Sequence, residues 1–253
     1  MEYIRGIFSL LWKLHVGLIF VLTTIVFYPI IVPFLAHRKT KKFAFKLFVV
    51  WSWAVRIGCF YFVKKVENNP LPIGPFIIVA NHASYLDIFL VYSIMSKTPF
   101  IFLGKIEILK YPLIKTYFKV LNIPVDRKNP IKAARALVTA AKCVKDNWSL
   151  MIFPEGGIPD ENNPKMIPFK VGAFQLAKSL KVPIVPITFV NNYRLLSDPD
   201  NFMGPARPGI SRVHIHPYFS IDEVKEMSQA ELSEACFNRI NTPILKEFPH
   251  FKE

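Results

Sequence analysis

The chain has 253 residues, of which 52% are hydrophobic and 14% aromatic, and its formal net charge is +14. This apolar content excludes a disordered or low-complexity chain, because such chains bury too little apolar surface to offset the entropy lost on folding. The positive charge suits a nucleic acid, an anionic membrane or a phosphorylated substrate. Because the chain is basic and apolar at once, the composition favours the membrane.

The first apolar segment, residues 14–36, carries no formal charge and is long enough to cross a bilayer. A secretory signal peptide fits poorly, because no small-residue cleavage site follows. A basic cluster at residues 38–42 follows instead, and the positive-inside rule places it on the cytoplasmic side. Pro29 and Pro33 interrupt the segment, so a kinked helix that enters only one leaflet is an alternative to a single pass.

A second apolar segment, residues 43–63, is interrupted by Lys46 and Arg56. On a continuous helix these two cations share one stripe with Lys64, which is typical of a helix lying in the membrane surface. Four aromatic residues are predicted to anchor it at the interface: Trp51, Trp53, Phe60 and Tyr61. The alternative is that both segments are core helices of a soluble protein.

Short apolar runs then alternate with helical segments, after a turn-rich entry at residues 66–74. Buried strands are predicted at residues 75–80, 98–103, 121–125, 148–153, 182–190 and 211–219. Helices are predicted at residues 84–96, 132–145 and 171–179, with a C-terminal helix opened by a capping box at Ser228 and Glu231.

This order predicts an α/β fold with a mixed, largely parallel sheet flanked by helices. We expect a membrane-associating helical pair over residues 1–65 and a second domain over residues 66–253.

Several common catalytic motifs are absent from the sequence, among them G-x-S-x-G, the P-loop, H-E-x-x-H and G-x-G-x-x-G. His214 and His216 alternate with apolar residues and would project to one face of a strand. No cysteine or carboxylate lies at metal-ligand spacing from them, so we expect no metal site.

His82 follows a buried strand and precedes a helix, in the segment N-H-A-S-Y-L-D. The carboxyl edge of an open α/β sheet is where such folds place their sites. Asp87, in the first helical turn, can fold back to hold one ring nitrogen of His82 and leave the other as a base. The alternative is that Asp87 completes a capping box with Ser84 and that His82 is an ordinary loop residue.

Two further segments follow predicted strands. The turn Phe153, Pro154, Glu155, Gly156 and Gly157 places a carboxylate beside backbone N–H groups, an arrangement that can hold hydroxyl groups or phosphate. Arg127, in the run P-V-D-R, has the planar fork that suits phosphate. An ordinary turn and a solvated surface arginine are the alternatives.

Four motifs occur in a fixed order within residues 76–190: N-H-x-x-x-x-D, P-V-D-R, F-P-E-G and V-P-I-V-P-I. The set resembles the glycerolipid acyltransferase family typified by 1-acylglycerol-3-phosphate acyltransferases. The resemblance implies that His82 is the general base and Asp87 its orienting partner. It also implies that Asn81 shapes the same turn, that Arg127 contacts the acceptor phosphate and that the F-P-E-G turn binds the acceptor.

The sequence departs from the family after the F-P-E-G turn, where Gly157-Ile158-Pro159 stands in place of Thr-Arg-Ser. One basic contact is therefore missing, and the acceptor head group is left open. Lys105 and Lys170 are candidates to replace the lost cation. The alternative is that both are ordinary exposed lysines.

The implied activity is transfer of an acyl group from acyl-CoA or an acyl carrier protein thioester to the free hydroxyl of a lysophospholipid. The first candidate acceptor is 1-acylglycerol-3-phosphate, and a lyso-aminolipid is an alternative. We expect no metal or other cofactor, no nucleic-acid partner and a catalytic domain on the cytoplasmic face of a membrane. A non-catalytic protein that binds membrane lipids is the alternative from another class.

Overall fold

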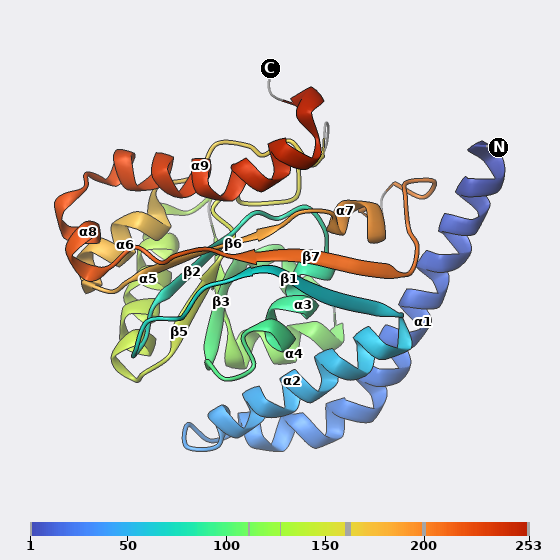
Figure 1. Ribbon diagram of the computed structural model, residues 1–253. Helices are drawn as coiled ribbons and strands as arrows, with labels where there is room; N and C mark the ends of the chain where they lie inside the picture. Colours follow the sequence, from blue (N-terminus) through green and yellow to red (C-terminus); the bar gives the residue numbers. More distant parts are fainter. Residues whose placement is uncertain (1, 111, 127, 160–162, 199–200, 252–253) are drawn as a thin grey trace.

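The computed structural model describes residues 2–110, 112–126, 128–159, 163–198 and 201–251. Within these residues, seven strands form one sheet in the order β1-β7-β6-β2-β5-β3-β4 (Figure 1). The strands are β1 Tyr61–Asn68, β2 Ile77–Ala80, β3 Phe100–Lys105, β4 Ile123–Val125, β5 Ser149–Ile152, β6 Ile184–Phe189 and β7 Gly209–Ile215.

The sheet is parallel at every pairing except that of β6 with β7, which is antiparallel. Its central strands are buried throughout, as expected of a parallel sheet covered by helices on both faces. The predicted fold class, a mixed and largely parallel α/β sheet, is confirmed.

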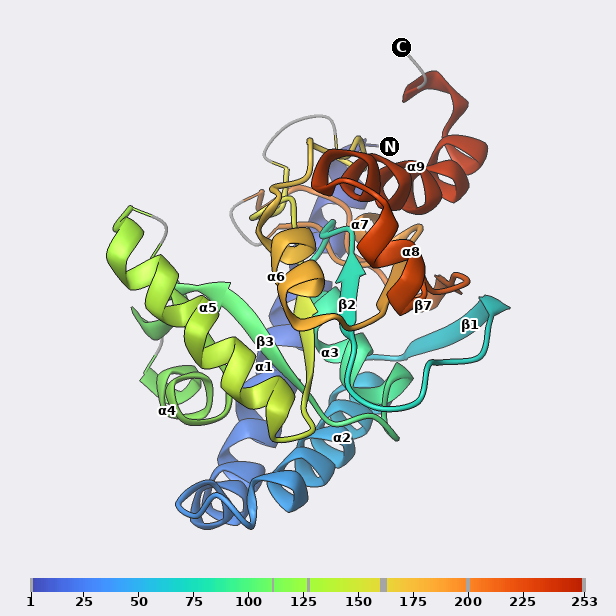
Figure 2. The same ribbon diagram turned by 90° about the vertical axis from the view of Figure 1, so that its left-hand side faces the viewer.

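The helices cover both faces of this sheet. They are α1 Glu2–Leu35, α2 Lys41–Gly58, α3 Leu86–Ile94, α4 Pro112–Leu121, α5 Pro130–Lys145, α6 Gly172–Leu180, α7 Asn192–Leu195, α8 Ile221–Glu226 and α9 Gln229–Glu247, with 3₁₀ turns η1 Ile106–Lys110 and η2 Pro249–Phe251. Contacts join α1 with α2 and α4, and α2 with α3, whereas α6 contacts α5, α8 and α9. The two views show these groups on opposite sides of the sheet (Figures 1 and 2).

Strand β1 is the main difference from the predicted elements. The second apolar helix ends at Gly58, because Phe60 adopts a positive φ of 50° that a right-handed helix does not allow. The chain then pairs in parallel with β7 over residues 61–68. The predicted continuous helix to residue 63 and the predicted linker from residue 66 are therefore wrong at these positions.

The domain boundary expected at residue 65 consequently falls inside a strand of the sheet. The division into an anchor and a second domain stays a prediction.

The predicted cation stripe on α2 is also wrong. The Arg56 side chain is buried, donates hydrogen bonds to Ser93 Oγ at 2.6 Å and to the Tyr61 carbonyl oxygen at 3.3 Å, and does not accompany the exposed Lys46. Of the four aromatic residues expected at the interface, Trp53 and Phe60 are exposed, but Trp51 and Tyr61 are buried. Helix α2 therefore packs against α3, with Arg56 bonded to Ser93 and Trp51 in edge contact with Phe89 of that helix.

Helix α1 exposes much of its apolar surface. In the part of the chain that the structure describes, it is the one helix long and apolar enough to cross a membrane, and only 17% of its most apolar window is buried. Its inner face is tied to the protein: Trp12 donates to Tyr61 and Tyr28 donates to Thr116. Its outer face exposes a row of large apolar side chains, Leu11, Leu14, Leu18, Val21, Leu22, Ile25 and Val26. Such a surface indicates membrane association.

Candidate active site

Two of the predicted motifs meet at one edge of the sheet. Strands β2 and β5 are parallel neighbours, with Val79 opposite Ile152, so the residues that follow them emerge side by side. His82 follows β2, and its ring stacks on Phe153, which follows β5, with ring centroids 4.1 Å apart and ring planes 14° apart. The sheet therefore brings the N-H-x-x-x-x-D and F-P-E-G segments together, as expected at the carboxyl edge of parallel strands.

Asp87 lies in the first turn of α3 and folds back onto the loop that carries His82. Its Oδ2 atom lies 3.0 Å from His82 Nδ1 and accepts hydrogen bonds from the backbone N–H groups of Ala83 and Ser84, both at 2.9 Å. Only half of the capping box considered as the alternative is present, because Asp87 accepts from the Ser84 N–H but the Ser84 hydroxyl does not accept from the Asp87 N–H. The same carboxylate oxygen that meets this N–H also meets the imidazole. Ser84 contributes by accepting a hydrogen bond from the Leu86 N–H.

The opposite oxygen of Asp87 has a partner from a distant part of the chain. Asn192 Nδ2 donates to Asp87 Oδ1 at 2.6 Å, across 105 positions of sequence. Asp87 and Asn192 are both fully buried. A buried carboxylate is tolerable only when hydrogen-bond donors compensate its charge, and this one accepts from three N–H donors in addition to facing His82 Nδ1.

This arrangement selects the tautomer of His82. Because Asp87 faces donors on every side, it acts as an acceptor, and His82 Nδ1 carries the proton that points to it. Nε2 is then the nitrogen available as a base, and the ring borders a cavity. A histidine held in this way can take a proton from a substrate hydroxyl.

Glu155 supports the same loop from the other side. Its carboxylate accepts hydrogen bonds from the backbone N–H of His82 at 2.8 Å and of Ile167 at 3.1 Å. Burial raises the pKa of Glu155 to about 7, aided by the nearby charge of Asp87, while the two N–H bonds act in the opposite direction. The side chain is only 2% exposed, so its visible function is to brace the backbone at His82. Acceptor binding by Glu155 stays a prediction.

Asn81 fastens the end of β2 to the neighbouring strand. Its side chain donates to the Phe189 carbonyl oxygen at 3.0 Å and accepts from the Phe189 N–H at 2.8 Å. This pair of bonds fixes the point at which the chain leaves the sheet toward His82.

Gly156 and Gly157 line the same cavity as His82. Gly156 has a φ of +92°, a conformation that favours glycine. A Cβ added at Gly157 would meet no atom within 4 Å, so that position is open. Pro154 is buried, and its carbonyl oxygen accepts a hydrogen bond from the Lys170 backbone N–H.

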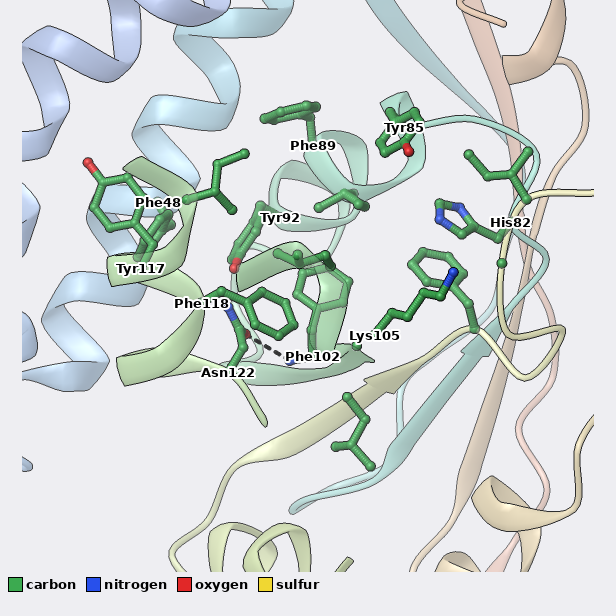
Figure 3. Close-up of a pocket in the computed structure, with 18 of the residues that line it drawn as sticks. Phe48, His82, Tyr85, Phe89, Tyr92, Phe102, Lys105, Tyr117, Phe118 and Asn122 are labelled. Atoms are coloured by element: carbon green, nitrogen blue, oxygen red, sulfur yellow. Dashed lines mark hydrogen bonds between the residues drawn. The ribbon is translucent and has the colours of Figure 1, made fainter. Parts of the chain in front are cut away.

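The cavity beside His82 has a volume of about 440 Å³ and runs between β3 and the first four helices (Figure 3). Ten of the 23 residues that line it are aromatic: Phe20, Phe48, Trp51, Tyr85, Phe89, Tyr92, Phe102, Tyr117, Phe118 and Phe153. The size lies within the range of small-molecule sites, ~300–1,000 Å³. An apolar ligand that enters this cavity would place its polar end near His82.

Of the three cations predicted to contact phosphate, the structure places one at the cavity. Lys105 lines the cavity, and Figure 3 shows its side chain extending toward His82. Lys170 is exposed and is not part of the cavity wall. Arg127 lies outside the described residues.

Asn192 is a site residue that sequence reasoning missed. It directly follows Asn191 at the carboxyl end of β6, so the rule that drew attention to His82 also applied to it. Its distance along the chain hid its relation to Asp87.

A second histidine cluster lies away from this site. His214 on β7 and His216, directly after the end of that strand, stack with ring centroids 5.7 Å apart. The Nδ1 atoms of both approach Glu67 of β1, at 3.3 and 3.2 Å. Sequence spacing had found no carboxylate partner for them, because β1 was not predicted. Among the described residues, no group of three or more His, Cys, Asp or Glu is arranged to hold a metal ion.

Comparison with known proteins places this geometry in context. Residues 59–190 match the family model described as Acyltransferase. The chloroplastic 1-acyl-sn-glycerol-3-phosphate acyltransferase BAT2 of Brassica napus is 30% identical over 84% of this chain and 60% of its own length. The 1-acyl-sn-glycerol-3-phosphate acyltransferase of Saccharomyces cerevisiae is 35% identical over 55% of this chain and 49% of its own. The chain thus spans about 60% of the length of the Brassica relative.

A solved structure shares the fold along nearly the whole chain. It is the 1-acyl-sn-glycerophosphate (LPA) acyltransferase PlsC from Thermotoga maritima, which matches with a TM-score of 0.76 and 24% identity over 98% of each chain. The family match covers more than half of this chain and includes both segments that meet at His82. The predicted resemblance is confirmed, and the chain belongs to the acyltransferase family.

Proposed function

We propose that this protein transfers an acyl group from an acyl thioester to the free hydroxyl of 1-acylglycerol-3-phosphate, with His82 as the general base. The observation that carries the proposal is the His82–Asp87 pair at a cavity with aromatic walls. The similar proteins from Brassica napus and Saccharomyces cerevisiae are named as 1-acyl-sn-glycerol-3-phosphate acyltransferases, which supports this choice of acceptor.

In the proposed reaction, Nε2 of neutral His82 removes the hydroxyl proton as the acceptor oxygen attacks the thioester carbonyl carbon. The new C–O bond forms, the C–S bond breaks, and the departing thiolate takes the proton back from the imidazolium. Asp87 stabilises the imidazolium while it exists, as the carboxylate of a catalytic triad does. No acyl-enzyme is needed, because the substrate hydroxyl is itself the nucleophile.

The cavity supplies the binding energy for an acyl chain in this proposal. Each methylene group that leaves water for an apolar wall contributes about 0.8 kcal/mol, so even a partly enclosed chain is held firmly. Lys105 brings a positive charge to the same cavity as His82, which suits a phosphate on the acceptor. Arg127 and Lys170 stay predicted contacts for that phosphate.

We further propose that α1 lies within one leaflet, on the cytoplasmic side, rather than crossing the membrane. The bonds from Trp12 and Tyr28 hold α1 against the protein at points 28 − 12 = 16 residues apart, which is about 24 Å along a helix. A helix whose inner face is held against the protein over most of a bilayer's thickness cannot be surrounded by lipid on all sides. The basic turn at residues 38–42 then meets anionic headgroups.

Cysteine labelling in sealed vesicles tests this orientation. Arg5→Cys and Lys39→Cys, made with Cys143 replaced by Ala, should react with an impermeant reagent from the same side. Reaction from opposite sides would establish a single pass instead.

Activity is tested with purified protein in a matrix of donors and acceptors. The donors are acyl-CoA and acyl carrier protein thioester; the acceptors are 1-acylglycerol-3-phosphate, other lysophospholipids and a lyso-aminolipid. We expect donor consumption that depends on lysophosphatidate, and a loss of roughly 10²–10⁴-fold or more in kcat for His82→Ala.

His214→Ala is the matched control, since this histidine lies outside the cavity. A folded His82→Ala protein with the wild-type rate would refute the proposed base. If wild-type protein consumes no donor with any acceptor, the protein is a lipid-binding protein rather than an enzyme.

A further inference from the structure

We propose that Asn192 and Ser211 are positioning residues that hold Asp87, and through it His82, in the orientation required for catalysis. The inference rests on the proposed function of His82 and extends it to two residues that lie outside the family motifs of the sequence. Both act through Asp87, and neither lies in the wall of the cavity.

The observation is a continuous chain of short hydrogen bonds. Ser211 Oγ donates to Asn192 Oδ1 at 2.6 Å, and Asn192 Nδ2 donates to Asp87 Oδ1 at 2.6 Å. Asp87 Oδ2 then meets His82 Nδ1 at 3.0 Å. Ser211, Asn192 and Asp87 are each fully buried, so water does not compete for any of these bonds.

The chain has a fixed direction. A serine hydroxyl carries one hydrogen, and Ser211 gives it to the amide oxygen of Asn192. The amide nitrogen must then face Asp87, because the flipped amide would place two oxygens against each other. Asp87, which can only accept, therefore fixes the orientation of the Asn192 amide, and Ser211 supports that orientation by donating to the amide oxygen.

Asn192 supports the oxygen of Asp87 that the His82 loop does not reach. Oδ2 takes the bonds from Ala83, Ser84 and His82, whereas Oδ1 is bonded to Asn192. Without the Asn192 donor, the carboxylate keeps its charge in a buried site with less compensation. The Asp87 carboxylate would then favour the protonated imidazole more strongly. His82 would therefore become available as a base only at a higher pH.

The neighbouring Asn191 provides a matched control. It donates to the Ile210 carbonyl oxygen at 2.9 Å and accepts from the Arg212 N–H at 2.8 Å, which fastens the start of α7 to β7. It is the same residue type on the same elements and is almost fully buried. These two bonds go to the β7 backbone and not to Asp87, so Asn191 separates anchoring of α7 from support of the carboxylate.

The experiment measures kcat and kcat/KM between pH 5 and pH 9 for Asn192→Ala, Ser211→Ala, Ser211→Thr and Asn191→Ala. We expect Asn192→Ala to lower kcat roughly 10–100-fold, the usual scale for residues that orient a catalytic group, and to move the acid limb of the profile to higher pH. Ser211→Ala should lower kcat and move the acid limb to higher pH, both by less than Asn192→Ala does. Ser211→Thr, which keeps the hydroxyl, should have the wild-type kcat and acid limb. Asn191→Ala should leave the acid limb in place, whatever its effect on the melting temperature.

The proposal is overturned if folded Asn192→Ala keeps its acid limb and a kcat within about threefold of wild type, well short of the usual scale. If that variant does not fold, an unmoved acid limb in Ser211→Ala overturns it instead. His82→Ala distinguishes this failure from failure of the proposed function. An inactive His82→Ala with an unaffected Asn192→Ala rejects the positioning role alone, whereas an active His82→Ala rejects the general base itself.

Discussion

Two histidine–carboxylate clusters in the described part of the chain, one after β2 and one between β1 and the end of β7, differ in which partner is buried. In the first, the Asp87 side chain is fully buried and that of His82 is 12% exposed. In the second, the Glu67 side chain is 37% exposed and that of His216 only 6%. The distances between the paired atoms are similar, 3.0 and 3.2 Å, so distance alone does not separate a base from a structural contact.

The second ring nitrogen explains the difference. His82 uses Nδ1 for Asp87 and borders the cavity, so Nε2 is available to a ligand. His216 also uses Nε2, which lies 2.8 Å from Thr188 Oγ1, and Thr188 in turn donates to the Ile240 carbonyl oxygen. The first cluster therefore leaves a ring nitrogen for the proposed proton transfer, whereas the second joins β6, the end of β7 and α9.

The largest contrast should come from removing each carboxylate charge. Asp87→Asn should lower kcat roughly 10³–10⁴-fold, because the amide no longer fixes the tautomer of His82 or stabilises the imidazolium. It also brings an amide N–H against the Asn192 donor. Steady-state kinetics on protein that retains a cooperative melting transition measure the effect.

Glu67→Gln is the matched control for this prediction and should keep kcat close to the wild-type value, because Glu67 does not line the cavity beside His82. Equal losses in the two variants would remove the functional distinction between the clusters.

A smaller effect concerns the brace behind His82. Burial raises the pKa of Glu155 from its usual 4.5 to about 7, so its contribution to stability is present below pH 4.5 and is lost as the pH rises through 7. Linkage gives a loss of about 2–3 kcal/mol between pH 5 and pH 8. Glu155→Gln should flatten this dependence in urea unfolding, whereas the exposed control Glu226→Gln should preserve it. A wild-type protein that gains stability from this group at pH 8 would contradict the assignment.

Contacts between residues close in the sequence could be predicted, whereas contacts that depend on the order of the strands could not. His82 and Asp87 could be paired because they are five positions apart at the start of a helix, where local geometry decides the contact. The contact between Asn192 and Asp87 depends on strand order, which periodicity does not determine. Strand β1 was missed because its apolar start continues the preceding helix, and its partner β7 lies far along the chain. Without β1, Glu67 could not be placed beside His214 and His216.

The smallest predicted effect tests the second cluster itself. Burial lowers the pKa of His216 from its usual 6.5 to about 4, and the charges of His214 and Arg239 act in the same direction, while Glu67 opposes them. A depressed histidine contributes stability above pH 6.5 that is lost as the pH falls toward 4, about 2 kcal/mol between pH 7 and pH 5. His216→Gln should remove this loss from melting curves, and the exposed His37→Gln should not. The opposite result is a wild-type protein that is as stable at pH 5 as at pH 7, with the same pH dependence in His216→Gln. The His216 ring would then be charged in the folded protein at pH 5, and the two clusters would resemble each other more closely than their burial implies.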